Sequence, residues 1–381
     1  MKPRTLILLS LISIALLALA VFAYSQRSTE FAAPTPERLY GGLIERVDDI
    51  AEIHIDGPRG PFHVDLDGDQ WRMRENGGYP IRTEKIREAV VSLSDLRVLE
   101  PKTSRPENYH MIGVQDPGPG ADSILVEMKT KDGEDIVSVI LGFIEHDATR
   151  TQPRRRYVRL TDDPRSYYID GVAEVEMDPM RWIDREILRV LRSWTHDVVI
   201  THPDGETLRI YKPTVEALDF SIADKPEGTE FIDERDVNLV GGSFIYIGME
   251  DVRPRDTLDP SKVVPGPVAT VRTFDGFVLT ATLFDYEGET WATFEASVGE
   301  PVVDIEEVNA ELESSSSGRS LATLRPIEEV EAAVEDMNER LANWRFKMTE
   351  NKTRLLAFRM TDLVQQPGEN RVSPIQPTQG P

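Results

Sequence analysis

Short alternating segments joined by Asp-Gly turns occur twice in this chain, and this repeated pattern constrains its fold more than any other sequence feature. In the first copy, segments 53–55 and 62–66 lead into the turns Asp56-Gly57 and Asp67-Gly68, and Trp71–Met73 follows. An Asp-Gly pair between alternating segments is a strong hairpin signal. We therefore expect a three-stranded antiparallel meander.

A second meander is predicted further along the chain. Segment 198–200 runs into Asp204-Gly205, and segments 208–210 and 218–222 follow it. Val199 lies 146 positions after Ile53, its counterpart in the first copy.

A helical pattern and a hairpin follow each meander. Apolar residues spaced by three and four predict one buried helix face; they are Ile86, Val90, Leu93 and Leu96 in the first copy and Val237, Val240, Phe244 and Ile247 in the second. The hairpins turn at Asp132-Gly133 and Asp275-Gly276, which are 143 positions apart. The two similar offsets favour two related modules, expected at residues 45–192 and 193–298.

The C-terminal part differs from both modules. Residues 299–365 are expected to form a helix-strand-helix extension, with a helix from Ile327 to Trp344, a strand at Trp344–Met348 and a short helix at Leu355–Leu363. Packing of the first helix on the second module is favoured over an intermolecular coiled coil, because fewer than ~3 heptads are present. The tail 366–381 is rich in proline and is expected to be disordered.

The N-terminal segment predicts a membrane anchor. Leu6–Ala23 is apolar apart from two serines, and a helix of this length spans about 27 Å of hydrocarbon. Because Lys2 and Arg4 precede it, the N-terminus is expected in the cytoplasm and the body in the periplasm of a bacterial cell. The anchor is assigned to residues 1–24 and a polar spacer to 25–44. A cleaved signal peptide is the alternative.

The complete fold-class prediction is therefore α+β: an N-terminal transmembrane helix, then two related modules of antiparallel β-meander, helix and β-hairpin, and a C-terminal helical extension.

The 381-residue chain has 43 Lys and Arg against 67 Asp and Glu, a net charge of −24. Such an acidic chain is repelled by phosphate backbones, so we expect no nucleic-acid partner. With no cysteine, it has neither a disulfide framework nor a lipid-attachment thiol.

No catalytic, cofactor or metal site is predicted. None of the six histidines pair at the i, i+4 spacing of a helical zinc site. His54 and His63 can meet across the first hairpin, but an ordinary surface pair is favoured over a metal site. The segment Asp65–Asp69 lacks the glycine and glutamate positions of a calcium-binding EF-hand loop and is interpreted as a hairpin turn.

One basic cluster interrupts the acidic sequence: Arg150, Arg154, Arg155, Arg156 and Arg159. These arginines are candidates for contact with an acidic partner or with lipid headgroups. The alternative, which charge balance favours, is pairing with the chain's own carboxylates.

Several motifs along residues 45–365 resemble bacterial domain-of-unknown-function family 4340. They are Trp71 with Tyr79-Pro80, the stretch Tyr109–Pro117, Ile140–Gly142, Arg156–Arg159, Tyr167–Asp170 and Trp344–Met348. Val114 stands where the family pattern has leucine. The resemblance implies an anchored extracytoplasmic protein linked to ABC-type transport systems, including those associated with gliding motility, and it supplies no catalytic residues.

The expected function is thus that of a non-enzymatic periplasmic scaffold subunit in an ABC-type transport or envelope complex. It would contact the inner membrane through residues 6–23 and protein partners through its body. Two alternatives stay open: a ligand- or glycan-binding protein that uses a groove between the modules, and an envelope hydrolase with unrecognised carboxylates.

Overall fold

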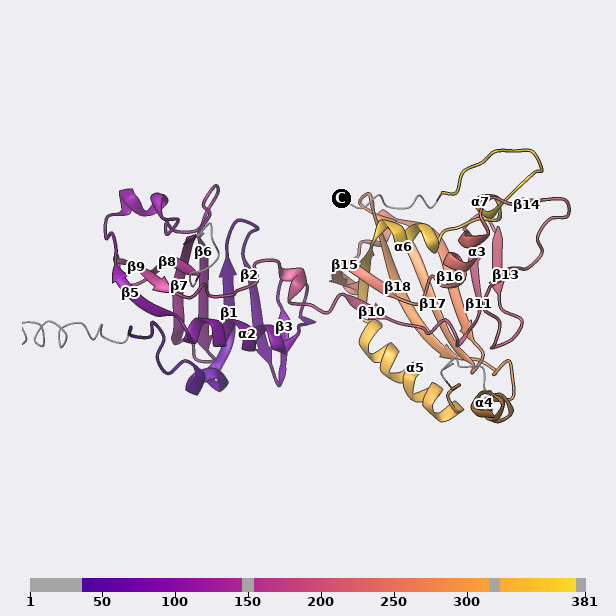
Figure 1. Ribbon diagram of the computed structural model, residues 1–381, viewed down its shortest axis with the longest axis horizontal. Coiled ribbons are helices and arrows are strands. Elements are labelled where there is room, and N and C mark those ends of the chain that lie inside the picture. Colours follow the sequence, from indigo (N-terminus) through magenta and orange to yellow (C-terminus); the bar gives the residue numbers. More distant parts are fainter. Residues whose placement is uncertain (1–35, 146–153, 315–322, 375–381) are drawn as a thin grey trace, which may run out of the picture. The chain divides into compact units, whose positions relative to one another are not determined.

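A computed structural model of the chain describes residues 36–145, 154–314 and 323–374, and these residues form an α+β protein built on two nine-stranded antiparallel sheets (Figure 1). Packing separates two compact units. The first contains residues up to Val64 together with Thr83–Met177, and the second contains Asp65–Arg82 and the chain from Asp178 onward.

The expected anchor, residues 1–24, and most of the spacer lie outside the described residues. Among the helices that the structure does describe, none has both the length and the apolar character required to cross a membrane.

The first sheet has the strand order β4-β3-β2-β1-β6-β7-β8-β9-β5. Its strands are β1 (Ile50–Asp56), β2 (Phe62–Asp67), β3 (Gln70–Met73), β4 (Tyr79–Pro80), β5 (Arg97–Pro101), β6 (Ile124–Thr130), β7 (Asp135–Glu145), β8 (Arg155–Leu160) and β9 (Ser166–Asp170). Two 3-10 turns accompany them, η1 (Ile44–Asp49) and η2 (Pro106–Met111). The predicted meander and the hairpin at Asp132-Gly133 are both present.

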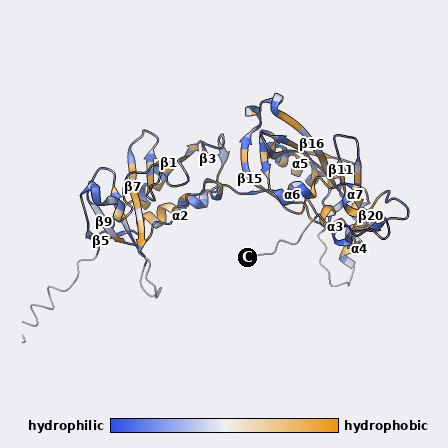
Figure 2. Ribbon diagram, turned by 90° about the horizontal axis from the view of Figure 1, so that it is seen from above, coloured by the Kyte–Doolittle hydropathy of each residue, from blue (hydrophilic) through white to orange (hydrophobic). Residues whose placement is uncertain are grey.

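Helix α2 (Thr83–Ser94) lies across the first sheet (Figure 1). Its buried residues include Ile86, Val90 and Leu93, which confirms the predicted helix face. Leu96 is also buried but follows the end of the helix. In Figure 2 hydrophobic residues mark both α2 and β7, as expected for elements that contribute to a core.

The second sheet has the strand order β10-β15-β19-β18-β17-β16-β11-β12-β13. Its strands are β10 (Glu186–Leu188), β11 (Thr195–Thr201), β12 (Thr207–Tyr211), β13 (Ser221–Ile222), β15 (Ile247–Pro254), β16 (Val263–Thr273), β17 (Phe277–Tyr286), β18 (Glu289–Val298) and β19 (Trp344–Met348). A small sheet pairs β14 (Glu230–Phe231) with β20 (Val364–Gln365). The 3-10 turns are η3 (Pro179–Arg181), η4 (Arg255–Thr257) and η5 (Pro260–Lys262).

The two large sheets share one strand order. The series β3-β2-β1-β6-β7-β8-β9-β5 in the first sheet matches β13-β12-β11-β16-β17-β18-β19-β15 in the second. A helix precedes β5 in the first half of the chain, and α3 (Glu234–Gly241) precedes β15 in the second. The order of strands, helix and hairpin expected from the sequence therefore recurs in both sheets.

The predicted second helix is too long. Helix α3 begins after Asp233, whose side chain accepts from the Arg235 backbone N–H, and it ends at Gly241. A Cβ atom on Gly241 would lie 2.4 Å from the Phe220 ring, so only glycine allows this close approach. Ile247, predicted to be helical, begins β15 instead.

The predicted C-terminal extension, residues 299–365, contributes β19 to the interior of the second sheet. Helices α4 (Ile305–Ser314) and α5 (Ile327–Leu341) precede this strand, and Trp344 belongs to it rather than to the helix. The single helix predicted at 355–363 is wrong, because α6 (Glu350–Leu355) and α7 (Met360–Leu363) are separate. Of the predicted disordered tail, residues 366–374 are described, and the Pro374 carbonyl accepts from Arg354 Nη1 at 3.1 Å.

Candidate functional site

The structure describes four of the five arginines of the predicted partner-contact cluster. Arg150 lies outside the described residues. The side chain of Arg154 is 60% exposed, and its Nη1 lies 3.3 Å from Glu174 Oε1. Arg155 opens β8 and places its guanidinium over the Tyr168 ring, 5.8 Å from the ring centre. These two arginines remain candidates for contact with a partner.

Arg156 and Arg159 are buried and bind their own chain. Arg156 donates from Nε to the Gly142 carbonyl at 2.9 Å and from Nη1 to the Val172 carbonyl, also at 2.9 Å. Burial lowers the pKa of Arg156 to about 10. Arg159 donates from Nε to the Val114 carbonyl at 3.0 Å, and its Nη2 binds the Asp116 carboxylate.

Two exposed apolar side chains lie near the same end of β7 as Arg154 and Arg155. Met111 is 67% exposed and Phe143 is 40% exposed. The Phe143 backbone N–H donates to the Ile112 carbonyl at 3.0 Å, which ties the end of η2 to β7. Glu145 at the end of β7 lies opposite Arg155 in the antiparallel pairing of β7 with β8. We call Met111, Phe143, Arg154 and Arg155 the β7-end surface.

Gly113 allows this surface to form. Its φ of 69° lies in the left-handed region, and a Cβ atom there would lie 2.7 Å from the Phe143 ring. Only glycine meets both requirements without strain. The family-like stretch Tyr109–Pro117 therefore has an identifiable structural role.

The predicted contact between His54 and His63 is present as a stack of the two rings. Their ring centres are 4.3 Å apart with an interplanar angle of 4°, and His54 Nδ1 lies 2.9 Å from Glu127 Oε2. Asp65, in the segment compared with a calcium loop, forms an ion pair with Arg74. Within the described ranges, no three or more His, Cys, Asp or Glu residues are arranged to hold a metal ion.

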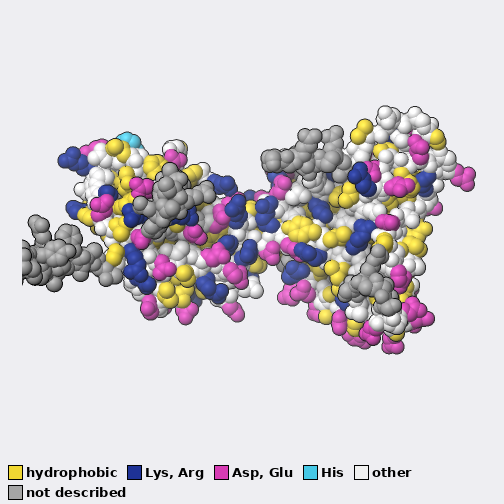
Figure 3. Space-filling view, viewed as in Figure 1, with side chains coloured by type: hydrophobic (Ala, Val, Ile, Leu, Met, Phe, Trp, Pro, Cys, Tyr) yellow, Lys and Arg dark blue, Asp and Glu magenta, His cyan; other side chains and the backbone are white. Residues whose placement is uncertain are grey.

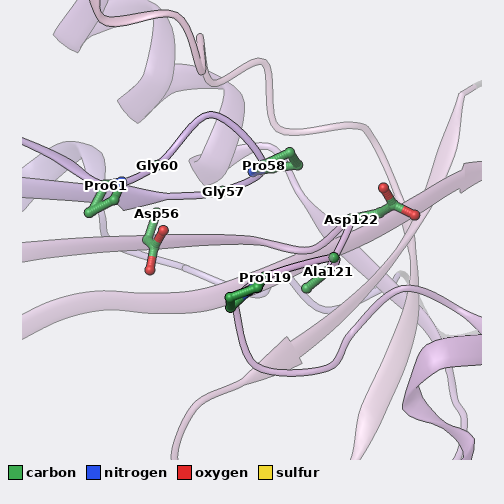
Figure 4. A pocket seen from close by; sticks show the side chains of 10 residues that line it. Asp56, Gly57, Pro58, Gly60, Pro61, Pro119, Ala121 and Asp122 are labelled. Carbon is green, nitrogen blue, oxygen red and sulfur yellow. The ribbon is translucent and has the colours of Figure 1, made fainter.

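A cavity of about 490 Å³ lies in the first unit between two loops rich in glycine and proline (Figure 4). One loop follows β1 and the other precedes β6. The wall is formed by Asp56, Gly57, Pro58, Gly60, Pro61, Gly118, Pro119, Gly120, Ala121 and Asp122. The carboxylates of Asp56 and Asp122 do not point toward one another (Figure 4), so this wall presents no convergent acid pair.

A second cavity, of about 430 Å³, lies in the second unit over β16, β17 and β18. Its wall is mostly apolar, as is usual for small-molecule sites. It is formed by Arg255, Leu258, Pro260, Val263, Pro265, Gly266, Val268, Thr282, Leu283, Phe284 and Thr293. The strand register changes between Pro265 and Val268, which interrupts the regular pairing of β16 with β17 at this wall.

Sequence reasoning did not single out the residues of the second cavity. Arg345 is buried in β19, whereas the sequence predicted only that it belongs to the alternating strand 344–348. The neighbours that bury it come from the loop after β15 and from β17 and β18.

Charged side chains of both signs are spread over the face shown in Figure 3 rather than gathered in one patch.

Two matching antiparallel sheets, few helices and no metal-binding group among the described residues define the class as an α+β sheet protein of unassigned chemistry. Residues 71–235 match the family model described as "Domain of unknown function (DUF4340)". The match confirms the resemblance inferred from the motifs between Trp71 and Asp170, whereas the motif Trp344–Met348 lies outside the matched residues. No curated protein and no solved structure is significantly similar to the chain.

Proposed function

We propose that this protein is a non-enzymatic auxiliary or scaffold subunit of an ABC-type transport or cell-envelope complex. Residues 6–23 would hold it in the bacterial inner membrane, with its body in the periplasm. The β7-end surface carries the proposal, because it combines exposed apolar side chains with cationic ones.

This combination suits a protein partner with apolar and acidic side chains. Large apolar side chains such as Met and Phe are common anchors at the centres of protein interfaces. Arg154 adds a cation, which forms an exposed ion pair with Glu174. Exposed ion pairs contribute only about 0–1 kcal/mol to stability, so Arg154 can leave Glu174 and bind a carboxylate of the partner with little loss of free energy. Complementary charge then favours the correct partner and speeds association.

The proposal is tested by affinity purification of the full chain from gently solubilised membranes. We expect wild type to recover subunits of a membrane complex and a Met111→Glu, Phe143→Glu double variant to lose them. Leu218→Glu is the matched control, because Leu218 is an apolar residue 53% exposed in the second unit. Failure of wild type to recover any membrane subunit would refute the scaffold role, and full recovery by the double variant would exclude this surface.

A further inference from the structure

The end of the first sheet that carries the β7-end surface is also the end at which the chain enters the first unit. Arg38 forms an antiparallel bridge with Arg97, the first residue of β5. Arg97 lies opposite Asp170, the last residue of β9, and Asp170 lies opposite Arg155, the first residue of β8. Arg155 in turn lies opposite Glu145, at which β7 ends. One row across the sheet therefore joins the entry point of the chain to the β7-end surface.

This row is short, and the entering chain is held at its first position. The Val98 backbone N–H donates to the Glu37 carbonyl at 2.9 Å, which fixes the entering chain on the edge of β5. Adjacent strands lie ~4.8 Å apart, so the three spacings between Arg38 and Arg155 amount to about 14 Å. The β7-end surface thus lies close to the point where the chain arrives from the predicted anchor.

The length of the connection favours one end of the strands as the end nearest to the bilayer. Fourteen residues, 24–37, connect the predicted membrane-spanning segment 6–23 to Arg38. A chain of that length extends to at most about 50 Å, and as a random coil it averages about 20 Å. Strand β7 has 11 residues and places its far end about 33 Å from the row that contains Arg38. The connection therefore favours the β7 end over the far end.

Charge also distinguishes the two ends of these strands. Four arginines at the β7 end lie next to four carboxylates, as ion pairs or cross-strand neighbours: Arg38–Asp95, Arg154–Glu174, Arg97–Asp170 and Arg155–Glu145. At the far end, the turns 131–135 and 161–165 contain five carboxylates and only two cations. An anionic membrane surface repels the far end more strongly, so charge favours the same orientation as the connection.

We propose that the β7 end of the first sheet faces the membrane, and that the partner bound there is an integral membrane subunit, contacted directly outside its membrane-spanning part. The inference rests on the proposed function, since it uses the predicted anchor and the β7-end surface. Met111 and Phe143 are exposed at this end, so the partner meets them close to the bilayer surface. Two apolar side chains offer little area for insertion into lipid, which favours a protein segment as the occupant.

The orientation is tested with the full chain alone in lipid nanodiscs. Because the chain has no cysteine, one introduced cysteine carries the only thiol-linked donor dye. His110→Cys places the dye next to Met111, and Lys131→Cys is the matched control in the turn between β6 and β7; both residues are exposed. We expect energy transfer to a rhodamine-labelled phospholipid to be at least twofold stronger from His110→Cys. Equal transfer, or stronger transfer from Lys131→Cys, would overturn the orientation.

The class of the partner is tested by photocrosslinking in native membranes. Benzophenone-maleimide on His110→Cys should form an adduct with a protein that alkaline washing does not remove, and the crosslinked peptide should adjoin a membrane-spanning segment. Lys131→Cys should give at least tenfold less of this adduct. Adding Met111→Glu and Phe143→Glu to His110→Cys should also reduce it at least tenfold, whereas adding Leu218→Glu should leave it unchanged.

Failure of this inference is distinguishable from failure of the scaffold role. If affinity purification recovers no membrane subunit, the scaffold role is refuted, and energy transfer still decides the orientation. If purification succeeds but the adducts contain only proteins that alkaline washing removes, the class of the partner is wrong and the scaffold role stands. Adducts with lipid alone, or no adduct at all, would likewise refute an integral membrane partner at this surface.

Discussion

Lys212 illustrates how a single buried charge makes stability depend on pH. Its side chain is almost fully buried, and its Nζ donates to the carbonyls of Arg192 at 2.9 Å and Ser193 at 3.3 Å. The ammonium also lies near the rings of Phe220 and Phe274. Burial, with a smaller repulsion from Arg192, lowers the pKa of Lys212 to about 8.

We predict that the free energy of unfolding of the wild-type protein rises between pH 8 and 10. In this window native Lys212 has released its proton, whereas an unfolded lysine, with a pKa of about 10.4, still binds it. One such proton contributes at most about 1.4 kcal/mol per pH unit. Urea unfolding at several pH values should show a clearly smaller rise for Lys212→Met.

Other groups also contribute to the pH dependence, among them Lys352 and Tyr40. Burial lowers the pKa of Lys352, so a smaller rise persists in the variant. Burial raises the pKa of Tyr40, which reverses the trend above about pH 10 because unfolded tyrosine ionises there first. Identical pH profiles for wild type and Lys212→Met would contradict the assignment.

At the scale of elements, Asn338 explains how α5 attaches to the second sheet. Strand β19 is short, and its pairing with β18 involves Trp291 and Ala292. Further along β18, the Asn338 side chain accepts from the Ala296 N–H at 2.8 Å and donates to the Ala296 carbonyl at 2.8 Å. The amide of one helix residue therefore replaces the missing strand neighbour.

Asn338→Ala should lower the free energy of unfolding by about 2–3 kcal/mol, because it leaves two buried backbone groups without partners. Hydrogen exchange of the Ala296 amide should accelerate more than that of other β18 amides. The control is Glu339→Ala on the same helix, whose exposed side chain should change stability by no more than about 0.5 kcal/mol. Equal effects of the two substitutions would refute the strand-replacement role.

The elements also reveal what the sequence could and could not predict. Helix α2 was predictable because its apolar residues follow helical spacing without glycine, whereas the close contact of Gly241 with Phe220 depends on the folded chain. The burial of Arg345 was not predictable, because it requires residues from three other segments. Spacing within one strand does not contain that information.

At the scale of the whole molecule, the shared strand order extends the sequence repeat to the folded chain. The longest difference between the matched series is the insertion of α4 and α5 between β18 and β19, where the first sheet joins β8 to β9 by the short segment 161–165. The cavity over β16, β17 and β18 and the β7-end surface use equivalent positions of this shared order, since β7 matches β17 and β8 matches β18. Equivalent sheets therefore carry different surfaces, and shared strand order alone does not define function.

The net charge of −24 leads to a final prediction about salt. Self-repulsion of so many carboxylates destabilises the compact state, and about 0.3 M NaCl screens it over distances beyond a few ångströms. Salt also weakens exposed pairs such as Arg46–Glu134, but each contributes only about 0–1 kcal/mol. We therefore expect the thermal midpoint to rise between low salt and about 0.3 M NaCl. Choline chloride at equal ionic strength should give the same rise, since screening does not depend on the cation. A thermal midpoint that falls on addition of salt would contradict the prediction, because it would mean that the ion pairs stabilise the protein more than the repulsion destabilises it.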